Sequence, residues 1–179
     1  AFAGVLGTTI VRLFDVSAAR TGLSEEEARA AGHDVETVLV PTPDRAHYYP
    51  GNKPIITKLI ADRATHRILG AQVFGEGVVD KPIDTLAMGI ALGMTAEQLS
   101  GMDLAYTPPF ASALNSSIVA ANVLLNKLDG KLRGVSPCAL ELDNPNQQLL
   151  DVRTEPEYLI AAIPNSINIP LPELRERID

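Results

Sequence analysis

The sequence predicts an α+β fold, in which an antiparallel sheet is covered on one side by helices. Two apolar runs, 55–61 and 68–74, flank the polar stretch 62–67, and this is the pattern of an antiparallel hairpin with a polar turn. Apolar side chains at helical spacing follow the hairpin and predict helices over 83–94 and 112–128. The hairpin supplies the centre of the sheet, and the helices supply its cover.

Two further strands are expected before the hairpin. Residues 5–16 are rich in β-branched and aromatic side chains, which favours a single strand. Residues 35–40 form a short β run. We expect Pro41 and Pro43 to close it.

Two capping boxes mark helix starts. Ser24 is followed three residues later by Glu27, and the helix that they open is expected to end at Gly32. Thr95 and Gln98 form the second box, which predicts a short helix after residue 94.

Charge and composition exclude several classes of function. The net charge is −7, the pI is about 4.9 and tryptophan is absent, so nucleic acid is an improbable partner. We expect no membrane partner, because no apolar run approaches the roughly 18–20 residues of a span. The start lacks both Met and a signal peptide, which suggests a chain that begins inside a longer protein. Cys138 is the only cysteine, so no intrachain disulfide is expected and the cytoplasm is the default compartment.

Most catalytic motifs are missing. The sequence contains no G-x-G-x-x-G, P-loop, H-E-x-x-H or G-x-S-x-G pattern. His33, His47 and His66 lie in or beside polar turns without a ligand at metal-binding spacing, so they are interpreted as exposed turn residues and no metal site is expected. Cys138 has no cation within four residues to activate its thiol.

Two aromatic segments remain as candidate sites. Tyr48-Tyr49-Pro50-Gly51 places two phenols on a rigid loop, where they either act chemically or cover a sheet edge. The run from Tyr106 to Phe110 contains two prolines, cannot be helical and is expected to be extended. Such a stiff apolar segment suits an interface or internal packing equally.

The composition changes after the last predicted helix. Prolines, glycine and asparagines between 129 and 148 indicate a linker. Beyond it we expect a strand at 149–153, a helical turn at 155–160 and a strand at 167–169. Some 31 residues are too few to bury a core of their own.

The first part resembles a known family. The segments that carry the resemblance are Ala3–Thr8, Ala19–Leu23, Tyr48–Gly51, Arg67–Gln72 and Tyr106–Phe110. They are similar to the C-terminal dimerisation domain of the FAD-dependent pyridine nucleotide–disulfide oxidoreductases, in the branch of coenzyme A-disulfide reductase, coenzyme A-persulfide reductase and NADH oxidase. The Tyr-Tyr-Pro-Gly segment favours coenzyme A disulfide or persulfide as the substrate.

The resemblance implies a role for the domain, which we place at residues 1–128. The parent enzyme would use FAD and NAD(P)H, bound upstream together with the redox cysteine, and would form a homodimer. Tyr48 and Tyr106 would act in the partner subunit's active site, with Tyr49, Pro108, Pro109 and Phe110 as substrate or interface residues. Family members often carry Lys-Asp-Pro where this chain has Leu114-Asn115-Ser116, which puts a coenzyme A phosphate contact there in doubt.

Residues 149–179 resemble the opening of a rhodanese domain. Leu150–Thr154 and Ile163–Pro170 match its first strand and the following turn and strand, and Ala161-Ala162 replace the usual Gly-His. The resemblance implies a truncated rhodanese-like α/β segment whose catalytic cysteine lies beyond Asp179.

Three interpretations of the function of the whole chain follow. The first is the dimerisation part of a coenzyme A disulfide or persulfide reductase. The second is the same part of an NADH oxidase or peroxidase-like flavoprotein, and the third is an assembly module whose tyrosines only pack. In every case the isolated chain is expected to bind no flavin and to be inactive.

Overall fold

The structure is a computed structural model that describes residues 4–177, apart from the side chain of Cys138. The chain divides into two compact units, Ala1–Arg133 and Gly134–Asp179. Within the described residues, the first unit contains a five-stranded sheet and the second a two-stranded sheet.

The sheet of the first unit is antiparallel throughout. Its strands lie in the order β1-β2-β5-β4-β3, so β1 and β3 form the two edges. The predicted hairpin is confirmed as β4 and β5, with Leu59 opposite Ala71. The five strands are β1 Thr9–Leu13, β2 Val16–Gly22, β3 Val35–Pro43, β4 Pro54–Asp62 and β5 Ile68–Gly75.

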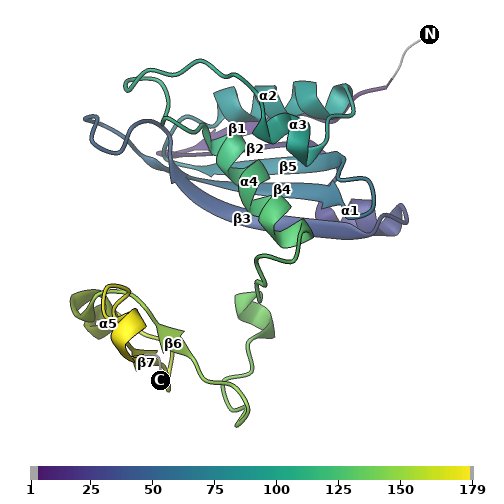
Figure 1. The fold of residues 1–179 in the computed structure, drawn as a ribbon. Coiled ribbons are helices and arrows are strands. Elements are labelled where there is room, and N and C mark those ends of the chain that lie inside the picture. The colour runs from purple at the N-terminus through teal and green to yellow at the C-terminus, as the bar shows by residue number, and fades with distance from the viewer. Residues whose placement is uncertain (1–3, 178–179) are drawn as a thin grey trace. The chain divides into compact units, whose positions relative to one another are not determined.

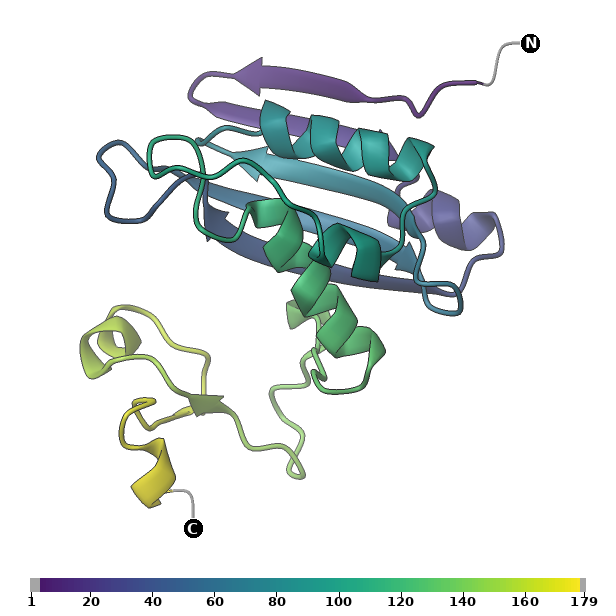
Figure 2. The ribbon, with the colours of Figure 1, turned by 45° about the horizontal axis from the view of Figure 1, so that its top comes forward.

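Three helices form a layer on one face of this sheet, as Figures 1 and 2 show: α2 Asp80–Ala91, α3 Ala96–Ser100 and α4 Ser116–Leu128. Alternate strand residues point into the layer, because successive side chains of a strand face opposite sides. The resulting core is apolar, and each large side chain buried in it contributes about 1.5–3 kcal/mol. The α+β fold is confirmed. Its core includes Ile55, Leu59, Val73, Leu86, Leu99 and Leu124.

The first helix, α1 Glu25–Ala30, packs at one end of the opposite face. Its Ala28 is buried with Ile60, which alternates with the core-facing residues of β4. An ion pair of 2.7 Å between Lys58 and Glu25 ties the helix to the same face. Both predicted capping boxes are present in full, at α1 and at α3.

The helix α2 ends earlier than the predicted 83–94. It stops at Ala91, because Gly93 adopts the left-handed conformation with φ of 68°. Met94 nevertheless packs against the core from the turn.

The N-terminal strand differs from the prediction. Residues 5–16 do not form one strand: the chain turns at Phe14 and Asp15, and β2 runs back along β1 from Leu13 opposite Val16. Phe14 has φ of 56°, a left-handed conformation that glycine or asparagine usually supplies. The turn therefore carries no recognisable sequence signal.

Pro41 does not close β3, which continues through it and ends at Pro43. Proline is tolerated there because β3 is an edge strand, whose outward N–H groups have no ladder partner. The Thr37 N–H donates to Glu36, and the Thr37 carbonyl accepts from Lys127. Thr37, Pro41 and Pro43 are separated by even numbers of residues, so their backbone groups point to the same side of the strand. The prolines therefore occupy positions whose backbone groups point away from β4.

The helix α4 begins at Ser116 rather than at 112. Asn115 is its N-cap, and its side chain accepts a hydrogen bond of 3.1 Å from the Ser117 N–H. The preceding run is not extended through Phe110, because the Phe110 N–H donates to Thr107 and the chain turns at the prolines.

The second unit contains short elements: the 3₁₀ helix Pro137–Ala139, β6 Leu150–Asp151, α5 Glu155–Ile160, β7 Ile167–Asn168 and α6 Leu174–Arg177. The strands β6 and β7 pair in parallel. The predicted strands are therefore present but shorter than expected, and α6 is additional. No helix among the described residues is long and apolar enough to cross a membrane.

Candidate functional site: the Tyr48 loop and the Tyr106 segment

The first part of the site is the loop of residues 44–53 between β3 and β4, called here the Tyr48 loop. Its tip is a tight turn, in which the Tyr49 N–H donates to Ala46 and Gly51 has φ of 77°. The Asn52 side chain donates to the carbonyls of His47 and Tyr49, at 2.9 and 3.1 Å. These bonds hold Tyr48 outward, with 64% of its surface exposed.

The second part is the connection between α3 and α4, residues 101–115, called here the Tyr106 segment. It lies beside the Tyr48 loop, because the Ala46 N–H donates to the Pro108 carbonyl at 3.4 Å. Tyr106 is 48% exposed. Two loops far apart in the sequence therefore place their tyrosines at one point on the surface.

The two phenols lie close enough for Tyr48 to affect the ionisation of Tyr106. The Tyr48 hydroxyl raises the pKa of the Tyr106 hydroxyl above its ordinary value of 10.0, and desolvation adds to the rise. Like an ordinary phenol, Tyr106 is protonated at neutral pH. A protonated phenol can donate a hydrogen bond, or transfer its proton to an atom that gains negative charge.

The remaining predicted residues lie around this pair. Tyr49 and Pro109 are half-buried and support the two loops, whereas Phe110 is 70% exposed. Leu114 is also exposed. Asn115 is buried as the helix cap, so it does not face solvent as a ligand residue would.

His47 is exposed in the Tyr48 loop, as predicted, whereas His33 and His66 are half-buried, and the fold brings a carboxylate to each of these two. The His33 Nδ1 lies 3.0 Å from Asp62, and the His66 Nδ1 is hydrogen-bonded to Glu97. No cluster of three possible metal ligands occurs among the residues that the structure describes.

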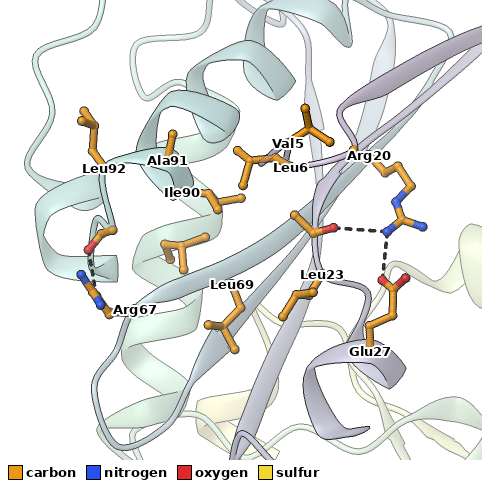
Figure 3. Close-up of a pocket in the computed structure, with 14 residues that line it drawn as sticks. Val5, Leu6, Arg20, Leu23, Glu27, Arg67, Leu69, Ile90, Ala91 and Leu92 are labelled. Atoms are coloured by element: carbon orange, nitrogen blue, oxygen red, sulfur yellow. Dashed lines mark hydrogen bonds and ion pairs between the residues drawn. The ribbon is translucent and has the colours of Figure 1, made fainter. Parts of the chain in front are cut away.

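A pocket of about 690 Å³ lies elsewhere, between the N-terminal segment, β2, β5 and the end of α2 (Figure 3). Two arginines flank its apolar floor. Arg20 is ion-paired with Glu27 and also donates to the Gly22 carbonyl, whereas Arg67 donates through Nε to the Gly93 carbonyl. The floor includes Leu6, Leu23, Leu69 and Ile90.

The residues present do not fit a flavin dinucleotide. Such a cofactor needs a glycine-rich turn that opens onto a helix from a parallel βαβ unit. In the first unit, Gly75 and Gly77 precede α2, but the sheet is antiparallel and the turn is filled. In the second unit, β6 and β7 are parallel, but residues 152–154 between β6 and α5 contain no glycine. A Cβ at residue 77 would lie 2.7 Å from the Asp44 Cβ.

Sequence reasoning missed Asp44 and Asn52, which shape the Tyr48 loop. Aspartate and asparagine in a proline- and glycine-rich loop are typical turn formers, and this was the available signal. Most of their partners lie in the same loop, and only the Val78 N–H that Asp44 accepts from lies outside it, so the role depends on how the loop folds.

Comparison with known proteins gives two family matches. Residues 8–118 match the model of the pyridine nucleotide-disulphide oxidoreductase dimerisation domain, and residues 137–179 match the rhodanese-like domain.

Among curated relatives, the NAD(P)H coenzyme A polysulfide/persulfide reductase of Pyrococcus horikoshii is 43% identical over 123 residues, covering 69% of this chain and 27% of the relative. Coenzyme A disulfide reductase of Staphylococcus aureus is 36% identical over 110 residues, covering 62% of this chain and 25% of the relative. The chain thus spans about a quarter of the length of these relatives.

Solved structures agree with this pattern. The NAD-dependent persulfide reductase from A. fulgidus is 45% identical with a TM-score of 0.90, over 99% of this chain and 32% of that one. The Bacillus anthracis CoADR-RHD is 34% identical with a TM-score of 0.93 and the same coverage. The water-forming NADH oxidase from Lactobacillus brevis is 26% identical, with a TM-score of 0.69 over 73% of this chain and 29% of that one.

The dimerisation-domain match extends over more than half of the chain, and the fold agrees with it. The chain therefore belongs to the pyridine nucleotide-disulphide oxidoreductase family, of which it carries the dimerisation domain followed by a rhodanese-like segment.

Proposed function

We propose that this domain completes the active site of a partner subunit in an FAD- and NAD(P)H-dependent reductase of coenzyme A disulfide or persulfide. The observation that carries the proposal is the exposed pair of Tyr48 and Tyr106, which lie on two loops joined by the hydrogen bond from the Ala46 N–H to the Pro108 carbonyl. Buried tyrosines would serve packing, whereas exposed ones with a protonated hydroxyl are available to a substrate.

The proposed chemistry is proton donation to sulfur. When a disulfide or persulfide is reduced, one sulfur leaves as a thiolate and gains negative charge. The Tyr106 hydroxyl donates a hydrogen bond to that sulfur, or gives it the proton and regains one from solvent. Tyr48 lies beside Tyr106 as a second phenol that can donate a hydrogen bond. The flavin and the nicotinamide supply the electrons from other domains, because this chain offers no cradle for them.

We propose that the unit acts as one half of a two-fold homodimer. Large apolar side chains stay exposed on α2, directly after it and on the Tyr106 segment, as with Met88 at 66%, Leu92 at 80% and Phe110 at 70%. A surface of this kind is typical of an interface between copies. The domain boundaries expected from the sequence, 1–128, 129–148 and 149–179, are kept as part of this proposal.

The test uses the full-length protein that contains this chain. We expect Tyr106→Phe to lower kcat for coenzyme A disulfide or persulfide reduction by about 10²–10⁴-fold, the range for a lost general acid. Tyr158→Phe is the matched control, because its hydroxyl bonds to Ser166 within the second unit. Unchanged turnover in Tyr48→Phe and Tyr106→Phe would instead support the assembly module.

The substrate class is tested separately. We expect turnover of NAD(P)H with coenzyme A disulfide or persulfide to exceed turnover with oxygen alone. The reverse preference would favour the NADH oxidase alternative. The persulfide reductase matches 99% of this chain, whereas the NADH oxidase matches 73% at lower identity, which favours the first candidate.

The isolated chain is proposed to be colourless and inactive. We expect no flavin absorbance band and no NADH oxidation by residues 1–179. We also expect no sulfurtransferase activity, because Cys138 is the only cysteine and precedes β6. A yellow protein or measurable NADH oxidation would contradict this part of the proposal.

A further inference from the structure

Asp44 is a buried carboxylate at the base of the Tyr48 loop. Its side chain is only 1% exposed. A charged group in such a place is costly unless every acceptor site is used. Four hydrogen bonds meet this need: Arg45 donates through Nε and Nη2, at 3.1 and 2.9 Å, and the backbone N–H groups of Lys53 and Val78 donate at 3.0 and 3.2 Å.

These bonds join three separate parts of the chain. Asp44 opens the Tyr48 loop and Lys53 closes it, and the Asp44 N–H returns a bond of 2.9 Å to the Lys53 carbonyl. Val78 lies two residues before α2, so the carboxylate also fixes the loop to the start of a core helix. Gly77 leaves room for this approach, since a Cβ there would lie 3.0 Å from the Asp44 Cγ.

Two backbone hydrogen bonds of Ala46 connect the start of the Tyr48 loop to the two tyrosines. Ala46, two residues beyond Asp44, is 5% exposed and donates its N–H to the Pro108 carbonyl. The same residue accepts from the Tyr49 N–H, which sets the turn that carries Tyr48. The position of Tyr48 relative to Tyr106 therefore depends on a loop base that Asp44 holds.

We propose that Asp44 is the positioning residue that holds the Tyr48 loop, and with it Tyr48, in place beside the Tyr106 segment. Its importance for turnover rests on the proposed function, in which this pair acts on the substrate. Asp44 itself touches neither phenol in this arrangement and acts through the loop.

The charge state of Asp44 agrees with this role. Burial raises the pKa of the carboxyl, but hydrogen bonds from Arg45, Lys53 and Val78 outweigh burial and lower the pKa below its ordinary value. Asp44 is thus ionised at neutral pH, when all four donors require an acceptor. Asparagine has the same shape but offers an NH₂ group to two of those donors, so it cannot accept all four bonds.

The experiment is a titration of tyrosine ionisation by ultraviolet absorbance in the full 179-residue chain. The chain has four tyrosines and no tryptophan, and Tyr106→Phe identifies the Tyr106 transition. We expect Asp44→Asn to shift the Tyr106 pKa down toward its ordinary value and to speed hydrogen exchange of the loop amides. Arg45→Met removes two of the four bonds and should shift the Tyr106 pKa less, in the same direction. This variant provides the test if Asp44→Asn does not fold.

Asp62→Asn is the matched control. Asp62 is also a buried carboxylate that organises a turn, through Thr65 and His33, but it lies at the other end of β4. We expect it to lower stability without moving the Tyr106 transition. An unchanged Tyr106 transition in either folded Asp44 or Arg45 variant would overturn the proposal. The titration involves no substrate, so it stands or fails independently of turnover measurements on the tyrosine variants.

Discussion

The Lys127 ammonium on α4 lies 2.8 Å from the buried carboxylate of Glu36 on β3. Arg63 reaches the same carboxylate at 2.6 Å, and Lys127 also donates to the Thr37 carbonyl. The last turn of the helix is therefore fastened to the beginning of the edge strand. Burial raises the pKa of Glu36, but hydrogen bonds from Lys127 and from the Thr37 N–H outweigh it, so the pKa is lowered from 4.5.

We expect Glu36→Gln to reduce the free energy of unfolding by about 1–3 kcal/mol at neutral pH, because two cations lose their shared partner. A carboxyl whose pKa is lower in the folded state than in the unfolded state stabilises the fold when the pH is above the unfolded-state pKa. This stabilisation is lost as the pH falls through the folded-state pKa. The difference between wild type and variant should therefore shrink below about pH 4. Urea unfolding at neutral pH and below about pH 4 measures this difference in the free energy of unfolding. Glu26→Gln, at an exposed position, is the control. Equal stabilities at neutral pH would contradict the prediction.

Gly70 lies opposite Gly22 where β2 and β5 pair. A Cβ at residue 70 would overlap the Leu23 carbonyl oxygen, which is backbone and cannot move aside. We expect Gly70→Ala to destabilise the first unit by about 3 kcal/mol or more. Gly134→Ala is the control, since a Cβ there meets nothing within 4 Å. Thermal unfolding that moves equally in both variants would refute this account.

Phe14 is 97% exposed and has φ of 56°, so its ring contributes no burial while its backbone is strained. We expect Phe14→Asn to stabilise the chain by about 0.5–1 kcal/mol, because asparagine tolerates this conformation. Phe14→Ala removes the ring and keeps the strain, and it should not produce the gain. Urea unfolding distinguishes the two, and equal effects would show that ring removal is the cause.

Tyr48→Phe should lower the pKa of Tyr106 toward 10.0, because the largest cause of the shift is removed. A group whose pKa is higher in the folded state than in the unfolded state stabilises the fold when the pH is below the unfolded-state pKa. This stabilisation is lost as the pH rises through the folded-state pKa. Any stability advantage of wild type over the variant should therefore disappear above about pH 10. Absorbance titration follows the pKa, with Tyr49→Phe as the neighbouring control. A transition unaffected by Tyr48→Phe would mean that the phenols do not interact.

Amides of 149–153 should exchange faster than those of 68–74. The helices and strands after residue 148 bury no side chain, whereas β5 is largely buried. Few buried contacts permit local opening at low cost in free energy. Hydrogen exchange by mass spectrometry tests this, and equal protection would mean that the second unit gains stability from contacts beyond its own core.

Local signals predicted those parts of the fold that local interactions determine. The capping boxes at Ser24 and Thr95 satisfy backbone donors within one turn of helix, so their sequence pattern is sufficient. The hairpin of β4 and β5 has alternating side chains and a polar turn, and it too was predicted.

Other features depend on partners distant in sequence. The turn at Phe14 is imposed by pairing of β2 with β5, and β3 passes through Pro41 because its edge position removes the need for a donor. The tyrosines were recognised by family resemblance, but their proximity arises from loops that only the folded chain brings together. Asp44 was missed for a similar reason, since its role depends on the fold of the loop and on the distant Val78 N–H.

The two edges of the five-stranded sheet are unequal. Along β3, prolines occupy outward positions 41 and 43, the Thr37 groups are taken by Glu36 and Lys127, and the Val35 carbonyl accepts from Arg29. Along β1, five exposed residues leave a continuous row of backbone groups. Leu39 lies between these positions, so the β3 edge is hindered and not fully closed, and strand addition is favoured along β1. Two copies that joined through β1 would present their hindered β3 edges on both outer sides, which disfavours growth beyond a pair into a fibre.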